Sequence, residues 1–206
     1  MARKGKNGET DVLGTSGDDV IHAGNGKGNV SGGDGNDSIT GGNGKDMLYG
    51  DAGDDSLHGG NGKDSLYGGD DNDLLNGGIG RDSLFGGDGA DTFVFDSSSM
   101  KGGSDTIKDF VASTTVTTTD STTGETTTTT ATNDVLEFHD MLDGYDPLAS
   151  NLDDYVQLTE VGGNTVVSVD RDGAANGAHF TAVVTLEDVT GLDEAALLAA
   201  GNIVVS

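Results

Sequence analysis

The stretch GGNGKDMLYGDAGDDSLHGGNGKDSLYGG, residues 41–69, places one large apolar residue at every ninth position of a glycine-rich chain. The pattern runs without a gap through nine nonapeptides, from Gly14 to Val94, with the template G-G-x-G-x-D-x-U-x, where U is large and apolar. Position 6 is Asp in every repeat except one, in which Gly28 replaces it. A fixed short period of this kind predicts a repeat architecture.

The spacing within each repeat predicts a parallel β solenoid. The three residues x-U-x form a short strand with one side chain turned inward, and the six residues before them form a tight turn. Glycine in that turn permits positive φ and lets backbone carbonyls approach one another. Two repeats make one coil of 18 residues, so repeats n and n+2 stack about 4.8 Å apart. The predicted interior consists of the residues at position 8: Ile21, Val30, Ile39, Leu48, Leu57, Leu66, Leu75, Leu84 and Phe93.

The acidity of the chain indicates what holds these coils together. The formal net charge of the 206 residues is −26, and Asp supplies 30 of the 36 acidic residues. Such a chain repels nucleic acids and anionic membranes. A disordered polyanion is the usual alternative, but the regular spacing favours a fold. A divalent cation neutralises the stacked acids, and calcium suits the pattern better than magnesium because it accepts six to eight oxygens, carbonyls included.

The repeats resemble those of the RTX (repeats in toxin) family, whose nonapeptide forms a calcium-bound parallel β-roll. The resemblance implies that each ion lies between turns n and n+2. The first turn supplies the carbonyls at positions 2 and 4 and its Asp. The second supplies the carbonyls at positions 1 and 3 and its own Asp. The alternative for these Asp residues is turn capping without a metal.

The metal ligands implied by this resemblance form two stacks. The carboxylates are Asp19, Asp37, Asp55, Asp73 and Asp91 on one side, and Asp46, Asp64 and Asp82, with Gly28, on the other. The backbone ligands are Gly33, Gly35, Gly42, Gly44, Gly50, Ala52, Gly59, Gly60, Asn61, Gly62, Gly69, Asp71, Gly77, Ile79, Gly86 and Asp88. The four gaps in the first stack and the three in the second, including the one at Gly28, predict up to seven Ca2+ ions, with the Gly28 site weak or empty. Asp71 stands where the template has glycine, so we expect strain in that turn.

Two further sets of residues recur outside the template. Tyr49, Tyr67 and Phe85 occupy position 9 at intervals of 18 residues. They predict a stacked aromatic ladder or a surface covered by the downstream segment, with a ligand platform as the alternative. His22 and His58 occupy the same position on the other side. We interpret them as surface residues, since no third zinc ligand is evident.

The chain changes character after Val94. The segment TFVFDSSSMKGGSDTIKDF, residues 92–110, resembles the exit cap of RTX rolls. Asp96 and Asp105 in this segment have two open interpretations, a terminal ion site or ordinary turn and cap roles. Residues 113–133 contain thirteen threonines, which predict either a projecting hairpin or a flexible loop.

The remaining residues predict strands and one helix. We expect a hairpin that turns at Gly162 and Gly163, a further strand within residues 179–189, a short helix within residues 193–201 and a final strand. Asp170 and Asp172 in the sequence DRDG predict a plain turn, because the rest of an EF-hand is missing.

The expected fold class is therefore all-β dominated, with three parts. Residues 1–13 are a lead-in that belongs to a preceding part of a longer chain. Residues 14–94 form the calcium-bound parallel β-roll, and residues 95–206 form a small β-rich cap and secretion domain with one short helix.

The C-terminal part resembles the target domain of type I secretion substrates, especially large RTX adhesins of Gram-negative bacteria. The resemblance runs through VVSVDRDG and FTAVVTLEDV. It implies an uncleaved signal near the carboxyl terminus, recognition by an ABC exporter, and an extracellular or cell-surface location. The amino terminus, MARKGKNGET, lacks the apolar core of a Sec signal peptide. The chain has no cysteine, so no disulfide or thiolate metal site is expected.

We expect no enzyme, because the sequence lacks H-E-x-x-H, G-x-S-x-G, P-loop and C-x-x-C motifs. The leading hypothesis is a module that stays unfolded at low cytosolic calcium and folds outside the cell. Its expected partners are the type I secretion machinery and the rest of the parent protein. The alternatives are a surface-, glycan- or ice-binding module, and the tail of an RTX protease or lipase.

Overall fold

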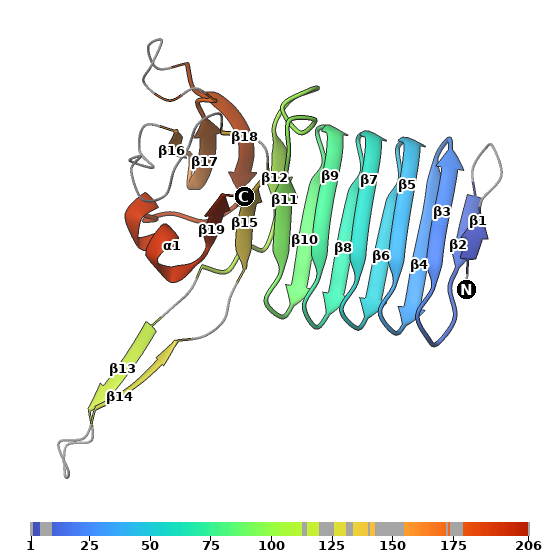
Figure 1. The fold of residues 1–206 in the computed structure, drawn as a ribbon, viewed down its shortest axis with the longest axis horizontal. Coiled ribbons are helices and arrows are strands. Elements are labelled where there is room, and N and C mark those ends of the chain that lie inside the picture. Colours follow the sequence, from blue (N-terminus) through green and yellow to red (C-terminus); the bar gives the residue numbers. More distant parts are fainter. Residues whose placement is uncertain are drawn as a thin grey trace.

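The structure is a computed structural model that describes residues 2–4, 10–112, 115–119, 126–130, 134–139, 141–142, 155–171, 173 and 179–205. Strands dominate these residues, and they contain a single helix, which confirms the predicted all-β fold class. Figure 1 shows the early strands side by side in a regular series, with the C-terminal elements gathered at one end of it. We call the stacked strands β1 to β12 the roll.

Two mostly parallel sheets contain all strands of the described residues except β13 and β14, and alternate strands of the roll belong to opposite sheets. In spatial order, the first sheet contains β1 (Ala2–Lys4), β3 (Val20–Asn25), β5 (Ser38–Gly44), β7 (Ser56–Gly62), β9 (Leu74–Gly80), β11 (Thr92–Phe95), β15 (Val135–Phe138) and β19 (Ile203–Val205). The second contains β2 (Thr10–Leu13), β4 (Gly28–Asp34), β6 (Met47–Ala52), β8 (Ser65–Asp70), β10 (Ser83–Asp88), β12 (Asp105–Ile107), β18 (Thr181–Leu186), β17 (Asn164–Val169) and β16 (Val156–Val161).

The register of the roll confirms the predicted stacking of repeats n and n+2. Ile39 pairs with Leu57 in the first sheet, and Leu48 pairs with Leu66 in the second, each across 18 residues. All nine residues at position 8 point into the core and are at most 1% exposed. The interior of the template repeats is therefore a double row of aliphatic side chains, with Phe93 as its last member.

The strands are longer than the three residues that the template predicts. β5 and β7 each contain seven residues, and their pairing continues from the x-U-x segment to Gly42 opposite Gly60 and Asn43 opposite Asn61. The prediction was wrong here because the first glycines of the next repeat also pair. Gly42 has a φ of 107°, and a Cβ there would lie 2.1 Å from the carbonyl oxygen of Gly24. Glycine at this position therefore lets extended strands stack closely, rather than only forming the turn.

Two Asp residues adopt the left-handed backbone conformation inside the roll. Asp71, which replaces the template glycine at position 4, has a φ of 77°, in line with the strain expected there. Asp51 at position 2 has a φ of 83°, which the sequence analysis did not anticipate. Asp tolerates this region better than most residues, so the roll accepts these exceptions to its glycine template.

The outer face of the second sheet carries the predicted aromatic stack. The ring centroids of Tyr49 and Tyr67 are 4.8 Å apart with planes inclined by 9°, and those of Tyr67 and Phe85 are 4.6 Å apart with planes inclined by 12°. On the first sheet, His22 and His58 are exposed. They are not neighbours, because Thr40 lies on the strand between them and pairs with both.

The stacked strands extend beyond both ends of residues 14–94. At the start, β2 pairs with β4 and β1 pairs with β3, so the strand Thr10–Leu13 is part of the sheet rather than a separate lead-in. At the other end, β12 adds to β10 and β15 adds to β11. Parallel pairing needs an extended backbone and an inward apolar residue, here Val12, Ile107 or Leu136, but not the template glycines.

The C-terminal elements complete the same two sheets. β16 and β17 form the predicted hairpin, with positive φ at Gly162 and Gly163. β18 pairs with β17 and also, in parallel, with β12. The helix α1 (Glu194–Ala200) lies within the predicted residues 193–201, and Gly201, whose φ is 79°, follows it. Because β19 pairs with β15, the end of the chain returns to the first sheet.

The threonine-rich segment contains two strands, β13 (Thr115–Thr119) and β14 (Thr126–Thr130), which pair antiparallel. This is the hairpin of the two alternatives, and it extends away from both main sheets (Figure 1). The residues between these strands, and Asp172 of the predicted DRDG turn, lie outside the described residues. Within the described chain, no helix has the length and apolar character needed to cross a membrane.

Candidate metal centre

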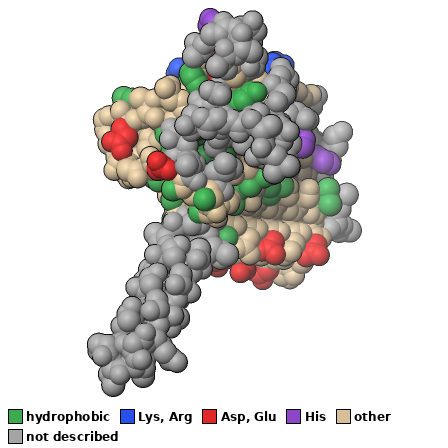
Figure 2. Space-filling view, turned by 60° about the vertical axis from the view of Figure 1, so that its left-hand side comes forward, with side chains coloured by type: hydrophobic (Ala, Val, Ile, Leu, Met, Phe, Trp, Pro, Cys, Tyr) green, Lys and Arg blue, Asp and Glu red, His purple; other side chains and the backbone are tan. Residues whose placement is uncertain are grey.

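The Asp residues at position 6 form two buried rows between successive turns. The first ladder contains Asp19, Asp37, Asp55, Asp73 and Asp91, and the second contains Asp46, Asp64 and Asp82. Each of these residues is at most 3% exposed, although Asp is normally a surface residue. By contrast, other acidic side chains gather in the open along one edge of the molecule (Figure 2). The position-6 carboxylates are therefore internal components of the roll.

Every ladder carboxylate except that of Asp19, the first of its row, uses one oxygen to accept a backbone N–H from the preceding turn. The N–H of Asp37 donates to Oδ1 of Asp55 at 2.6 Å, and the N–H of Asp46 donates to Oδ1 of Asp64 at 2.8 Å. The backbone completes the link, because the carbonyl oxygen of Asp37 accepts the N–H of Ser56 at 2.8 Å. The carboxylates thus take part in the coil-to-coil pairing of the backbone.

The second carboxylate oxygen has no such partner. Seven ladder residues have a buried Oδ2 that accepts no hydrogen bond, namely Asp37, Asp46, Asp55, Asp64, Asp73, Asp82 and Asp91. A buried polar atom without a partner costs about 1–3 kcal/mol, and more when it is charged. A series of such atoms requires either protons or cations.

Backbone carbonyls converge on these same oxygens. A Cβ at Gly50 would lie 2.2 Å from Oδ2 of Asp55 and 2.6 Å from the carbonyl oxygen of Gly68. At Gly68, the corresponding distances to Asp73 Oδ2 and the Gly86 carbonyl oxygen are 2.1 and 2.5 Å. Glycine at position 1 therefore leaves room for a carboxylate and a carbonyl to approach each other, and these are the oxygen donors that calcium prefers.

The predicted backbone ligands lie in matching rows beside the ladders. Gly42, Asn43 and Gly44 are in register with Gly60, Asn61 and Gly62, which lie one coil further on. Six more pairs follow the same registers: Gly33 opposite Asp51, Ala52 opposite Asp70, Gly69 opposite Gly87, Asp88 opposite Asp70, Gly60 opposite Gly78 and Ile79 opposite Asn61. The predicted glycines at position 1 lie against the carboxylates of their own repeats, since a Cβ at Gly59, Gly77 or Gly86 would lie within 2.8 Å of Oδ2 of Asp64, Asp82 or Asp91. At position 4, a Cβ on Gly53 would contact the backbone of Gly35, and one on Gly89 would contact that of Asp71.

No part of the described chain brings three His, Cys, Asp or Glu side chains together as a metal cluster. Each gap between two successive Asp residues of a ladder instead offers two carboxylates. The residues present fit a hard cation only if carbonyl oxygens complete its coordination, which is the arrangement that the template implies.

Burial strongly disfavours the charged form of the ladder carboxylates. Desolvation is the largest cause of a rise in the pKa of Asp64 and of Asp73 to about 7, and of Asp55 to about 6. The N–H donated by the preceding rung opposes this rise, whereas the neighbouring ladder carboxylates add to it. A divalent cation in the gaps would remove both causes, because it compensates for lost hydration and neutralises the repulsion.

At Gly28, the second ladder keeps its backbone link but lacks a carboxylate. The N–H of Gly28 donates to Oδ1 of Asp46 at 2.7 Å, as the N–H of an Asp does in other rungs. The gap between these two residues therefore contains one carboxylate instead of two, which accords with the weak or empty site expected there.

Both ladders continue past the last template repeat. The N–H of Asp82 donates to Oδ1 of Asp105 at 2.8 Å, and that of Asp91 donates to Oδ1 of Asp134 at 3.1 Å. Desolvation raises the pKa of Asp105 to about 8 and that of Asp134 to about 6. From the sequence alone the role of Asp105 is open, and Asp134 is not predicted as a ladder residue. The available signal was Asp followed two residues later by Ile107 or Leu136, which preserves positions 6 and 8 of the template.

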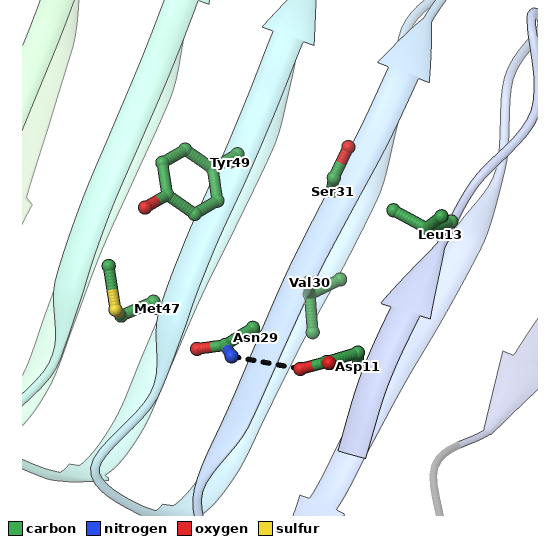
Figure 3. Close-up of a pocket in the computed structure, with 7 residues that line it drawn as sticks. All are labelled: Asp11, Leu13, Asn29, Val30, Ser31, Met47 and Tyr49. Carbon is green, nitrogen blue, oxygen red and sulfur yellow. Dashed lines mark hydrogen bonds between the residues drawn. The ribbon is translucent and has the colours of Figure 1, made fainter.

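A separate depression of 470 Å³ lies on the outer face of β2, β4 and β6 (Figure 3). Its lining residues are Asp11, Leu13, Asn29, Val30, Ser31, Met47 and Tyr49. Asn29 Nδ2 donates to Asp11 Oδ1 at 2.8 Å across its floor. None of the position-6 Asp residues contributes to this depression, so it is distinct from the candidate metal sites.

Comparison with known proteins gave one family match. The model described as RTX calcium-binding nonapeptide repeat (4 copies) matches residues 5–27, 28–57 and 58–93. A search of curated proteins found no match. Among solved structures, the extracellular lipase LipA from Serratia marcescens aligns at 16% sequence identity with a TM-score of 0.32. The alignment covers 98% of this chain and 40% of that chain, so the protein spans less than half of the lipase's length.

Proposed function

Residues 5–93 match the RTX calcium-binding nonapeptide repeat, and from this premise we propose that the chain is the calcium-triggered folding and export module of a secreted protein. The calcium-binding roll is a structural module, and we assign it no catalytic step. One observation carries the proposal: buried, unpartnered carboxylate oxygens recur along both ladders.

Without calcium, the ladders oppose folding. Stacked Asp side chains such as Asp55, Asp73 and Asp91 must each give up water, and they repel one another along the row. In the unfolded chain the same carboxylates are hydrated and further apart. A low calcium concentration therefore favours an unfolded chain, which is the form that a type I exporter passes.

With calcium, the same residues favour folding. Asp37 and Asp55, with the carbonyls of residues such as Gly50, would hold an ion that supplies positive charge and joins two coils. The free energy of binding then becomes free energy of folding. Extracellular calcium modules have Kd values of about 10⁻⁴–10⁻³ M, so we expect sites of this class to fill only outside the cell.

The secretion part of the proposal rests on the C-terminal resemblance to type I targets. The segments that carry it lie in β17, β18 and the residues around them. We propose that this region bears an uncleaved signal for an ABC exporter, and that the parent protein is a large adhesin at the cell surface. The C-terminal strands would leave the exporter first. They would then provide sheet edges for the roll, because β12 pairs with β10 and β15 pairs with β11.

The alternative of a glycan-binding face gains little from the aromatic stack. Its three rings lie nearly parallel at 4.6–4.8 Å, so they cover much of one another's faces. A sugar ring stacks on an exposed aromatic face, and the stack offers such a face only at its ends. We therefore favour the export module.

Three repeats provide a matched test, because each has a buried Asp at position 6 and an exposed Asp at position 3. One variant changes the buried Asp37, Asp73 and Asp91 to Asn. The control changes the exposed Asp34, Asp70 and Asp88 to Asn, with the same loss of charge in the same repeats.

Secretion through an ABC exporter into calcium-containing medium would then be measured for both variants. We expect slower secretion only for the buried set. Equal secretion by the wild type and both variants would contradict the proposal.

A further inference from the structure

The outward-facing row at position 9 of the second sheet is interrupted at one strand. In spatial order it contains Leu13, Ser31, Tyr49, Tyr67 and Phe85. The three rings stack on one another, but the next residue in the row, Ser31, has only a hydroxymethyl group, and Leu13 beyond it is 68% exposed. The short serine leaves the depression on β2, β4 and β6 (Figure 3), which we call the Ser31 notch.

One wall of the Ser31 notch is the face of an aromatic ring. Tyr67 covers one face of Tyr49, whereas the neighbour on the other side is Ser31, whose side chain is too short to cover a ring. Among the described residues, no second ring stacks on that face. Leu13 and Tyr49 lie two strands apart, about 9–10 Å, so one flat group fits between them. Such a group would take the place of the missing ring in the stack.

A second departure from the template lies at the same place. Asp51 replaces the glycine of position 2 and has a left-handed φ of 83°. Its carboxylate accepts a hydrogen bond from the hydroxyl of Ser31, so it reaches the notch from the strand that carries Tyr49. Burial, the neighbouring Tyr67 and the Asp51 carboxylate, in that order, raise the pKa of Tyr49. Backbone strain in a residue other than glycine is concentrated at functional sites.

The charges around the Ser31 notch are negative. Asp11 lies on the opposite wall, and Asn29 Nδ2 holds its Oδ1 at 2.8 Å. Among the described residues that line the notch, none is Lys or Arg. With Asp51, two carboxylates therefore border a ring face, in a chain whose net charge is −26. This field attracts a cationic group and repels an anionic one.

We propose that the Ser31 notch binds the guanidinium group of an arginine presented by a basic protein partner. A guanidinium is a flat cation, so it would stack on the open face of Tyr49 and donate from its edge to the Asp51 carboxylate. A lysine ammonium has the charge but lacks the plane. A neutral sugar ring has a face that can stack but leaves both carboxylates without a counter-charge.

This inference goes beyond the proposed export function and does not depend on it. The notch contains none of the position-6 Asp residues, and its strands lie at the opposite end of the second sheet from β16, β17 and β18. A partner bound there would occupy the outer face of the early repeats, away from the C-terminal elements (Figure 1).

Nuclear magnetic resonance titration of the calcium-saturated full chain tests the ligand chemistry. The probe is N-acetylarginine amide, and the comparison compounds are the matching amides of citrulline and lysine, together with methyl glucoside. We expect arginine to shift the resonances of Ser31 and Tyr49, lysine to bind severalfold more weakly, and citrulline and the glucoside to give no shift at the same concentration. No response to arginine, an equal response to lysine, or a response to the glucoside alone would overturn the inference.

Two variants and a matched control test the geometry. Asp51→Gly restores the template residue and removes the strain, so the roll should fold, and we expect arginine to bind about fivefold more weakly or worse. The control Asp70→Gly removes the same charge from an exposed position of β8 and should bind like the wild type. Ser31→Tyr completes the stack and should abolish binding. Equal weakening in Asp51→Gly and Asp70→Gly, or full binding by Ser31→Tyr, would overturn the inference. Because calcium is saturating throughout, these outcomes are independent of the folding switch.

Discussion

Oδ1 of Asp64 accepts the N–H of Asp46 at 2.8 Å, whereas Oδ2 of the same carboxylate is buried without a hydrogen-bond partner. One side chain thus has two functions in the roll. The first oxygen fixes the register between two coils, and the second is left for a cation. Because this arrangement recurs along both ladders, the stability of the roll and its metal content are coupled.

Removing ladder carboxylates should raise the calcium concentration needed for folding. For the variant with Asn at positions 37, 73 and 91, we expect the midpoint of a calcium titration to rise by about tenfold or more, equivalent to about 1.4 kcal/mol. The control with Asn at positions 34, 70 and 88 should stay close to the wild type, because those side chains are exposed. Far-UV circular dichroism gives both midpoints, and equal shifts would show that net charge alone is responsible.

The metal-free protein should gain structure on acidification. The pKa values of Asp64 and Asp73 are raised from 3.8 to about 7 by burial. For a carboxyl whose folded-state pKa is raised, the folded state binds more protons, so stability is fully present below pH 3.8 and is lost as the pH rises through about 7.

In calcium-free buffer we therefore expect a stronger β signal at acidic pH than at pH values above about 7. Calcium should act in the opposite direction, because it competes with protons for the same oxygens and binds more tightly as the pH rises. A metal-free β signal that stays constant or grows from pH 4 to pH 8 would contradict the role of these carboxyls.

Two adjacent leucines in β9 allow the loss of core packing to be distinguished from the general effect of shortening a leucine side chain. Leu75 is 0% exposed at position 8, whereas Leu74 is 41% exposed. Leu75→Ala should lower the free energy of unfolding of the calcium-saturated protein by about 2–5 kcal/mol. Leu74→Ala should change it much less. Urea titration at constant calcium measures both values, and a similar loss in the two variants would mean that position 8 is not the core.

Two glycines test the close approach of carbonyl and carboxylate. A Cβ at Gly50 would lie within 2.6 Å of both Asp55 Oδ2 and the Gly68 carbonyl oxygen, whereas a Cβ at Gly17 would meet nothing within 4 Å. We expect Gly50→Ala to weaken calcium binding severalfold and Gly17→Ala to leave it close to that of the wild type. Isothermal titration calorimetry provides the comparison, and unchanged binding in Gly50→Ala would remove that region from the metal site.

Much of the roll follows from the nonapeptide period, because one buried residue such as Leu66 and one glycine-rich turn recur at fixed spacing. The period predicts the 18-residue register between successive coils, the two sheets and the two Asp ladders. It does not give the lengths of the strands, since pairing continues through Gly42 and Asn43, where the template indicates a turn.

The ends of the roll were harder to predict. Asp134 joins the first ladder 43 residues after Asp91, across the threonine-rich hairpin, and no local pattern spans that distance. Similarly, the strand Thr10–Leu13 pairs with β4 although it lacks the template glycines. At these positions, backbone pairing and burial determine the structure, and neither requires the consensus residues.

A calcium titration followed by far-UV circular dichroism, begun in a chelator and repeated with magnesium, tests the central claim most directly. The account predicts a cooperative gain of β signal with calcium at about 10⁻⁴–10⁻³ M, the range of extracellular calcium modules, and no comparable gain with magnesium. A roll that is fully folded in the chelator at neutral pH would contradict it, because the buried Asp ladders would then tolerate their charge without a metal.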